Sequence, residues 1–204
     1  MRVNLTFSRT LTAAAMAFAL SVSVLSVAQA KQRSGAAGTS ISNFGCINEN
    51  FYRGAQPKSR DFSDLAAMGV KTVVDLQEDG ERNEQQTVEA AGMNFFRVGM
   101  SDSSWPSRDK ADQFLKIVND PANQPVFIHC HGGRHRAGIM TAIYRMTHDG
   151  WSADQAYSEM KQYGFEKGFG HGSLKDYVYD YYAGLDRKSL DRKSEKGIAV
   201  KTEK

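Results

Sequence analysis

The stretch "PVFIHCHGGRHRAGIMTAIYRM", Pro125 to Met146, decides the fold because it joins an apolar strand to a helix through a short glycine-rich loop. The apolar run ends at Cys130, and apolar residues with helical spacing resume after Arg136. A buried strand that leads into a helix is the unit from which parallel sheets are built. Ligands of such sheets bind beyond the carboxyl ends of the strands, so we expect a ligand site at residues 131–136.

The same alternation of short apolar runs and amphipathic segments continues along the chain from residue 51 onward. Strands are expected over 50–57, 70–77, 94–100 and 125–130, and helices over 59–68, 81–91, 108–118, 137–148, 152–162 and 173–184. Ser107 is a suitable N-cap for the helix over 108–118, and the helix over 81–91 is polar enough to lie on the surface. This order predicts an α/β fold in which a central, mostly parallel sheet is flanked by helices.

Both ends of the chain differ in composition from the part between them. Residues 1–30 begin with arginines and an uncharged apolar run and end in Ala28-Gln29-Ala30, a pattern typical of a cleaved signal peptide. An uncleaved membrane anchor is the alternative, because the uncharged run is just long enough to span a bilayer. The predicted organisation is a signal peptide (1–30), a flexible linker (31–45), one folded domain (46–186) and a disordered basic tail (187–204). We expect an exported protein, periplasmic or secreted, without stable membrane insertion after cleavage.

The positive charge of the chain is concentrated at its two ends. The whole chain carries a formal charge of +3, and its last 18 residues hold seven Lys or Arg and three Asp or Glu. The first 30 residues add Arg2 and Arg9 without any acid, which leaves residues 31–186 at −3. A mildly acidic domain argues against nucleic acid as a partner, since nucleic-acid binding needs a basic face.

The residues of the loop suit a phosphate ester. Gly132 and Gly133 allow unusual backbone dihedrals and leave N–H groups uncovered, and such groups at a helix N-terminus bind oxyanions. Arg136 offers two parallel donors that match two phosphate oxygens. Positive surroundings favour the thiolate form of Cys130, which is the nucleophilic form. A thiolate at the base of a phosphate cradle is placed to attack phosphorus and form a phosphocysteine.

His129-Cys130, followed by five residues and then Arg136, resembles the HC-x5-R signature of protein tyrosine phosphatases, above all their compact dual-specificity group. The resemblance extends over about 50–184 and includes "FYRGAQP" and "GVKTVVDL". It implies a cysteine phosphatase-like fold and a phosphomonoester hydrolase in which Cys130 is the nucleophile and Arg136 the phosphate clamp. The phosphate would be bound by His131, Gly132, Gly133, Arg134, His135 and Arg136, and His129 would support the loop. The implied mechanism needs no cofactor and no metal.

The resemblance also implies an aspartate that donates a proton to the leaving oxygen, on a mobile loop roughly thirty residues before the cysteine. Here that loop is "MSDSSWPSRD", in which Asp102 lies 28 positions and Asp109 lies 21 positions before Cys130. Asp109 falls in the first turn of a predicted helix, where an acid offsets the helix dipole. We therefore favour Asp102 as the acid, and Trp105 is either a lid wall or a core residue.

Ala137 departs from the family pattern, which usually has Ser or Thr directly after the arginine. The family hydroxyl donates to the thiolate and makes sulfur a better leaving group in the second step. We therefore expect Cys130 to attack normally while hydrolysis of the phosphocysteine is slow. The departure also leaves open a module that binds phosphate without turning it over.

Three further interpretations use the same residues. A rhodanese-type sulfurtransferase also places a cysteine loop between strand and helix, but its usual loop has four residues before the arginine, and that position is His135 here. A metal site built from the cysteine and the nearby histidines is disfavoured, because His129 and Cys130 are neighbours at a strand end and should point to opposite sides. A merely buried cysteine does not account for the basic side chains around it.

The cations of the loop indicate which class of substrate the site would bind. His131, Arg134 and His135 exceed what one phosphotyrosine requires, and extra cations favour a polyanion. The order Gly-Arg-His-Arg resembles the Gly-Lys-His-Arg of the fungal inositol-pyrophosphate group. We expect phosphotyrosine-type protein substrates first and inositol phosphates or phosphoinositides second.

Other residues outside the loop have simpler interpretations. Cys46 is the only other cysteine, and a reversible disulfide would protect the thiolate of an exported enzyme if Cys46 lies near Cys130. Arg53 is interpreted as a brace of the sheet edge, with a contact near the phosphate site left open. Asp75 and Gln77 end a strand and are candidates for steadying the loops at the site.

Overall fold

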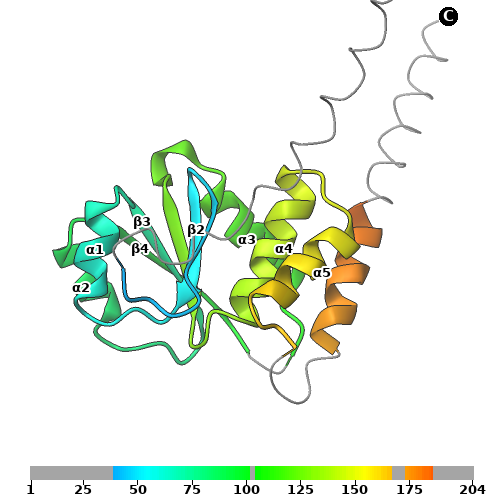
Figure 1. Cartoon of the computed structure of the whole chain (residues 1–204), viewed down its shortest axis with the longest axis horizontal. Helices are drawn as coiled ribbons and strands as arrows, with labels where there is room; N and C mark the ends of the chain where they lie inside the picture. Colours follow the sequence, from blue (N-terminus) through cyan, green and yellow to red (C-terminus); the bar gives the residue numbers. More distant parts are fainter. Residues whose placement is uncertain (1–38, 102–103, 167–172, 186–204) are drawn as a thin grey trace, which may run out of the picture. The chain divides into compact units, whose positions relative to one another are not determined.

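The computed structural model describes residues 39–101, 104–166 and 173–185 (Figure 1). The predicted signal peptide over 1–30 and the predicted tail over 187–204 lie outside the described residues. In the described part, no helix has the length and apolar character needed to cross a membrane.

The centre of the fold is a five-stranded sheet with the strand order β1-β2-β5-β3-β4. Its strands are β1 (Gly45–Asn48), β2 (Phe51–Ala55), β3 (Thr72–Gln77), β4 (Asn94–Met100) and β5 (Val126–Cys130). Only β1 runs antiparallel to its neighbour, so the predicted mostly parallel sheet is confirmed. Strand β5 is central and buried along its whole length, as a parallel strand covered on both faces must be.

Helices cover both faces of the sheet (Figure 1). One side carries α1 (Asp61–Ala67) and α2 (Glu84–Ala90), and the other carries α3 (Arg108–Val118), α4 (Arg136–His148), α5 (Ala153–Gln162) and the helical residues 173–185. A short 3-10 turn, Pro121–Asn123, leads into β5. Each side has its own apolar core, with Phe127 of β5 in one and Ile128 in the other. The alternating faces of one strand therefore hold two cores together.

Serine caps set the starts of two helices where the sequence predicts them. Ser107 accepts a hydrogen bond from the backbone N–H of Lys110 at 3.4 Å. Ser152 and Gln155 form a reciprocal capping box at the start of α5. Local side-chain chemistry thus fixes where α3 and α5 begin.

One predicted boundary of the folded domain is wrong. Residues 39–45 are not linker, because Ile41 and Phe44 are buried and the Phe44 ring stacks on Phe127 at 6.0 Å. Residues 45–48 then form β1, so the folded domain begins before residue 46. Helix α2 lies at the surface as predicted, with Gln85, Gln86, Glu89 and Ala90 exposed, although Glu84 and Val88 are buried.

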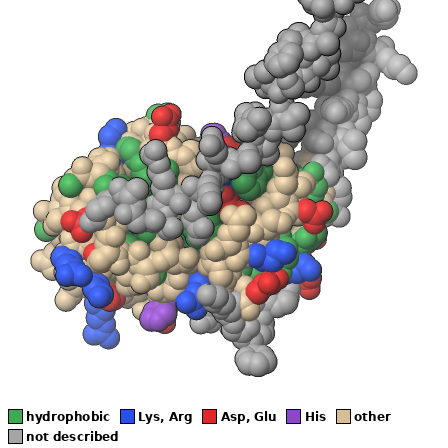
Figure 2. Space-filling view, viewed as in Figure 1, with side chains coloured by type: hydrophobic (Ala, Val, Ile, Leu, Met, Phe, Trp, Pro, Cys, Tyr) green, Lys and Arg blue, Asp and Glu red, His purple; other side chains and the backbone are tan. Residues whose placement is uncertain are grey.

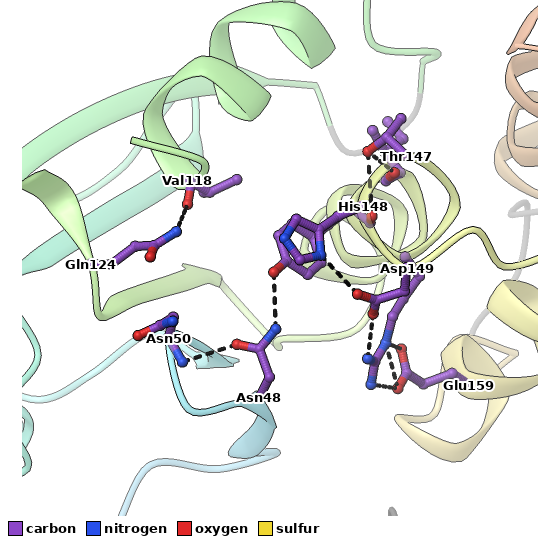
Figure 3. A network of polar contacts seen from close by, with 11 residues as sticks. Asn48, Asn50, Val118, Gln124, Thr147, His148, Asp149 and Glu159 are labelled. Carbon is purple, nitrogen blue, oxygen red and sulfur yellow. Dashed lines mark hydrogen bonds and ion pairs between the residues drawn. The ribbon is translucent and has the colours of Figure 1, made fainter. Parts of the chain in front are cut away.

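The sheet end remote from Cys130 is fixed by a polar network (Figure 3). Asn48 donates to the Tyr144 hydroxyl at 2.9 Å, which ties the turn between β1 and β2 to α4. His148 Nδ1 lies 2.8 Å from Asp149 Oδ1, so this histidine has a partner that the sequence did not indicate. Arg145 binds Glu159 at 2.7 Å and thereby joins α4 to α5. Helix α4, which starts at the loop after Cys130, is therefore held at its far end.

Candidate active site

Cys130 is the last residue of β5 and is buried, with 3% of its surface exposed. It lies opposite Ala55 of β2 and belongs to the core on the α3–α5 side. His129 faces the other side, where its ring stacks on Phe127 at 5.9 Å. The expectation that His129 and Cys130 point to opposite faces is therefore confirmed, and the thiol stands at the carboxyl edge of the sheet.

The two loop glycines serve different purposes. Gly133 has φ +63°, and a Cβ on it would lie 2.5 Å from the backbone carbon of Gly54. Only glycine combines that dihedral with such a close approach to β2. Gly132 has negative φ, and a Cβ there would meet nothing closer than the Arg134 side chain at 4.0 Å. The steric need for glycine therefore rests on Gly133, which seats the loop against β2.

The carbonyl groups of His131 and Gly133 point away from the interior of the loop. The carbonyl oxygen of Gly133 accepts from the guanidinium of Arg53 and from Asn43 Nδ2, the latter at 2.7 Å. The carbonyl oxygen of His131 accepts from the backbone N–H of Gln56 at 3.3 Å. A trans peptide directs its N–H opposite to its C=O, so the N–H groups of the residues after these carbonyls point toward the loop interior. With the N-terminus of α4 at Arg136, this arrangement is suited to binding an oxyanion.

Arg136 reaches the same edge of the sheet as Cys130. Its side chain is 10% exposed, and Nη1 lies 3.3 Å from the carbonyl oxygen of Met100 and 3.8 Å from Asp79 Oδ1. Asp79 follows β3 and is highly exposed, so its interaction with Arg136 is screened by water. A bound phosphate would compete with this carboxylate for the guanidinium. The sequence did not single out Asp79.

The three extra loop cations divide into two kinds. His131 and Arg134 are exposed. His135 is half-buried, its Nε2 lies 3.1 Å from the carbonyl oxygen of Phe165, and its ring packs edge-on against that phenyl ring. His131 and Arg134 are therefore better placed to meet a substrate than His135.

Behind the loop, His129 is held by an acid that the sequence did not indicate. His129 Nε2 lies 2.7 Å from Glu84 Oε1, and both side chains are fully buried. Burial alone would raise the pKa of Glu84, but the contacts with His129, Gln56 and Arg97 outweigh it and hold the pKa below its ordinary value. Helix α2 is thus attached to His129, the residue next to Cys130.

Asp75 and Gln77 belong to the same network. The Gln77 side chain donates to Gln56 Oε1 at 2.6 Å, and the Gln77 backbone N–H donates to Asp75 Oδ1 at 2.9 Å. Arg97 Nε donates to Asp75 Oδ2 at 2.9 Å. These contacts connect β3 with β4 and with Gln56, which directly follows β2.

The network brings three potential metal ligands together. Oxygen atoms of Asp75 and Glu84 and a ring nitrogen of His129 lie within 4.8 Å of one another. Arg97 contacts both carboxylates, at 2.9 Å and 3.8 Å. The guanidinium therefore supplies the positive charge that a metal would bring, and we assign the cluster to loop support.

Four further residues singled out from the sequence lie in the loop before α3 or at the starts of α3 and α4. Asp102, the predicted acid, lies outside the described residues. Trp105 is 46% exposed and packs edge-on against Tyr177 at 5.4 Å, so the loop before α3 contacts the helical residues 173–185. Asp109 lies in the first turn of α3, as predicted. Ala137 is fully buried in the first turn of α4.

Known proteins with similar sequences include an inositol diphosphatase and a probable tyrosine-protein phosphatase. The inositol diphosphatase SIW14 of Saccharomyces cerevisiae is 29% identical over 131 residues, which are 61% of this chain and 46% of that protein. The probable tyrosine-protein phosphatase DG1060 of Dictyostelium discoideum is 27% identical over 130 residues, which are 61% of this chain and 78% of that protein. The matched region therefore spans about half the length of the first relative.

Solved structures share the fold. The core catalytic domain of the PP-IP phosphatase SIW14 from S. cerevisiae, in complex with citrate, superposes with a TM-score of 0.61 at 25% identity and covers 76% of this chain and 94% of that one. P. aeruginosa TpbA, a Cys-to-Ser variant in complex with pTyr, gives a TM-score of 0.55 at 21% identity and covers 74% of this chain and 99% of that one. The second likeness concerns the fold alone.

A family model covers most of the folded part and includes the strand, loop and helix around Cys130. Residues 28–174 match the family described as "DSP-PTPase phosphatase fused to NAD+ Kinase". The match agrees with the cysteine phosphatase-like fold and with the resemblance seen in the HC-x5-R stretch. The chain therefore belongs to this family of dual-specificity-type protein tyrosine phosphatases.

Proposed function

We propose that the chain is a cysteine-dependent phosphatase that hydrolyses phosphomonoesters through a phosphocysteine intermediate. The observation that carries the proposal is the placement of Cys130 beneath a loop whose carbonyls at His131 and Gly133 are turned outward. The N–H groups of Gly132 and Arg134, which follow these two carbonyls, point toward the interior of the loop that begins directly after Cys130. Arg136, at the start of α4, completes the cradle with a planar pair of donors.

In the first proposed step, Cys130 Sγ attacks phosphorus, an S–P bond forms, and the ester P–O bond breaks. The leaving oxygen takes a proton from Asp102. In the second step, water attacks phosphorus and gives a proton to Asp102 while the S–P bond breaks. Inorganic phosphate leaves, and the electron pair of the broken bond returns to Sγ.

The basic test is hydrolysis of an aryl phosphate by the wild type and by Cys130→Ser, with vanadate as inhibitor. We expect turnover by the wild type, inhibition by vanadate, and loss of turnover in the variant. Retained phosphate binding without hydrolysis of any substrate would instead favour the binding module.

The proposed role of Asp102 is tested by comparing leaving groups. Asp102→Asn should lower kcat/KM, which reports cleavage of the ester bond, by about a hundredfold or more on alkyl phosphates, whose oxygen needs a proton, and much less on a nitrophenyl phosphate. Asp79→Asn is the matched control, because Asp79 is a carboxylate near Arg136. If Asp79→Asn shows the leaving-group dependence and Asp102→Asn does not, the acid has been assigned to the wrong residue.

Protein substrates with phosphotyrosine are the first candidates, and the similarity to the Dictyostelium DG1060 protein supports them. Inositol phosphates are the second candidates. The exposed His131 and Arg134 favour them, as does the similarity to the SIW14 inositol diphosphatase. Both cations would contact additional phosphates of a polyanion.

A panel of phosphotyrosine peptides, phosphoserine peptides and inositol polyphosphates separates these classes when it is combined with Arg134→Ala. A polyanion that contacts Arg134 should lose about tenfold in kcat/KM, since one such contact is worth about 1.4 kcal/mol. A phosphotyrosine peptide should change little. Lys116→Ala is the matched control, because Lys116 is an exposed cation in the last turn of α3. Equal losses on both substrate classes would exclude a selective polyanion contact.

A further inference from the structure

Arg53 is a fully buried guanidinium beneath the loop that follows Cys130. It lies in the middle of β2 and pairs with Ile128, two residues before Cys130 on β5. Residues two apart on a strand share a face, so Arg53 and Cys130 project to the same side of the sheet. Its Nη1 reaches Thr141 of α4 at 3.4 Å, which identifies that side as the one covered by α4. Arg53 therefore does not brace the sheet edge, and the alternative of a contact near the phosphate site holds.

The direct partners of Arg53 are neutral. Its Nη2 donates to the carbonyl oxygen of Gly133, and its guanidinium carbon lies 4.1 Å from the centre of the Tyr163 ring. Its Nε has no hydrogen-bond partner in the part of the chain that the structure describes. Within the described residues Arg53 forms no ion pair, whereas Arg145, another buried arginine, binds Glu159 and Asp149.

A buried charge without a counter-ion is costly, and a fold retains it where it has a function. Guanidinium groups stay protonated in proteins, so the charge cannot be lost by titration. Burial lowers the pKa of Arg53, while Tyr163 and Cys130 act in the opposite direction. An anionic sulfur is therefore a favourable neighbour for this cation.

We propose that Arg53 is a positioning residue that stabilises the thiolate form of Cys130 by placing a fixed positive charge beneath the loop. The inference rests on the proposed function. The charge would act at two moments of the cycle. It favours the thiolate before attack, and it favours the return of the electron pair to Sγ when the S–P bond breaks.

The other charged and titratable groups near this pair have to be considered in any pH experiment. They are Arg136 at the start of α4, Glu159 on α5, Tyr163 after α5, His135 in the loop and His129 on the opposite face of β5. Glu159 is already bound to Arg145. None of these residues is itself substituted in the variants, and of the five only Tyr163 packs against the Arg53 guanidinium.

A simpler role for Arg53 would be to hold the carbonyl of Gly133 in place without any electrostatic effect on sulfur. Asn43 allows the two roles to be separated, because its Nδ2 donates to the same carbonyl oxygen at 2.7 Å and carries no charge. Asn43 has φ +54°, a dihedral that glycine adopts without strain. Asn43→Gly therefore removes a neutral donor from the same carbonyl, together with its bonds to the carbonyls of Gly132 and Tyr163, and serves as the uncharged control.

The experiment measures the rate of Cys130 alkylation by iodoacetamide as a function of pH, in a Cys46→Ser background so that the exposed Cys46 does not react. Arg53→Met should move the pH of half-maximal rate upward by about one unit, the size expected from loss of one nearby opposite charge. Arg53→Lys, which keeps the charge, should move it much less. Asn43→Gly should leave the midpoint where it is.

Arg53→Met is expected to fold, because methionine is of similar length and replaces a buried charge with an apolar side chain. Circular dichroism and the urea midpoint check this, and Arg53→Lys provides a second comparison if the methionine variant is unfolded. An unshifted midpoint in folded Arg53→Met, or a midpoint in Arg53→Lys that rises as far as in Arg53→Met, overturns the proposal. Aryl-phosphate hydrolysis by the wild type is measured in parallel, so a wild type without turnover rejects the proposed function independently of the alkylation result.

Discussion

Ala137 places a methyl group where α4 begins, directly after the arginine that closes the cradle. The residue is fully buried, and its backbone carbonyl accepts from the Thr141 hydroxyl at 2.7 Å. Its methyl side chain has no hydrogen-bond donor for the sulfur of Cys130. Departure of sulfur from phosphorus therefore lacks a donor at this position, and we expect the second chemical step to limit the rate.

Replacing this residue tests that expectation. Ala137→Thr should raise steady-state turnover by about tenfold, because a hydrogen bond to a charged sulfur is worth about 1.5 kcal/mol or more. The burst that reports phosphocysteine formation should keep its rate. Rapid-quench and steady-state measurements on an aryl phosphate give both quantities.

Ala137→Val is the matched control, because valine has the shape of threonine without the hydroxyl. Both replacements add volume at a fully buried position, so any cost of overpacking is shared by the pair. A steady-state rate in Ala137→Thr that is unchanged or lower, or equal gains in both variants, rejects the hydroxyl explanation.

At the scale of whole elements, local patterns predicted most of the fold. Helix α3 runs over Arg108–Val118, as expected, because its apolar spacing and the Ser107 cap are both properties of neighbouring residues. Strand β1 was missed because its four residues, Gly45 to Asn48, show no distinct apolar alternation and obtain their order from pairing with β2. The burial of Glu84 in α2 was not predicted. It depends on contact with His129, 45 positions later in the chain, and no local pattern carries that information.

The docking of α2 through Glu84 has a pH dependence with a definite sign. The folded-state pKa of Glu84 is lowered from its ordinary value of 4.5, so the pair contributes stability above pH 4.5 and loses it as the pH falls through the folded pKa. Glu84→Gln should lower the free energy of unfolding at pH 7 by about 3 kcal/mol, because it removes a buried carboxylate whose partners His129, Gln56 and Arg97 remain. The difference from the wild type should shrink below pH 4.5.

Urea unfolding at pH 7 and at several acidic values measures this difference. Glu89→Gln is the control, because Glu89 lies on the same helix and is exposed. A Glu84→Gln penalty that is independent of pH, or one no larger than that of Glu89→Gln, would contradict the ion-pair interpretation.

At the scale of the whole molecule, the parallel sheet determines which distant residues meet at the site. Cys130, Arg136 and the loop between them were predictable because the whole cradle is one continuous segment. Arg53 and Asn43 were not, because each reaches Gly133 from about 80 or 90 positions earlier in the chain. Their contribution follows from strand order, since β2 is the neighbour of β5.

The same strand order keeps the two cysteines apart. Cys46 on β1 pairs with Tyr52, and Cys130 on β5 lies opposite Ala55, with β2 between the two strands. Across the sheet, the two cysteines are two strand spacings apart, and along β2 their partners Tyr52 and Ala55 are three residues apart. The two displacements are perpendicular and together separate the Cα atoms of Cys46 and Cys130 by about 14 Å. A disulfide needs about 7 Å or less, so the sequence-based hypothesis of a protective bridge between them is wrong for this fold.

Oxidation should therefore act on Cys130 without help from Cys46. A thiolate exposed to mild peroxide forms a sulfenic acid, which a small thiol reduces back. We expect peroxide to inactivate the enzyme and dithiothreitol to restore activity. Cys46→Ser should match the wild type in the rate of inactivation and in the rate of recovery.

Mass spectrometry of the oxidised wild type should show no peptide that links residues 46 and 130. A linked peptide, together with poorer recovery of Cys46→Ser, would mean that β1 leaves the sheet edge far enough to bring the two sulfurs together, and the geometric argument would then fail. If the chain is exported as we propose, an enzyme without an internal partner for its thiolate depends on external thiols to stay active.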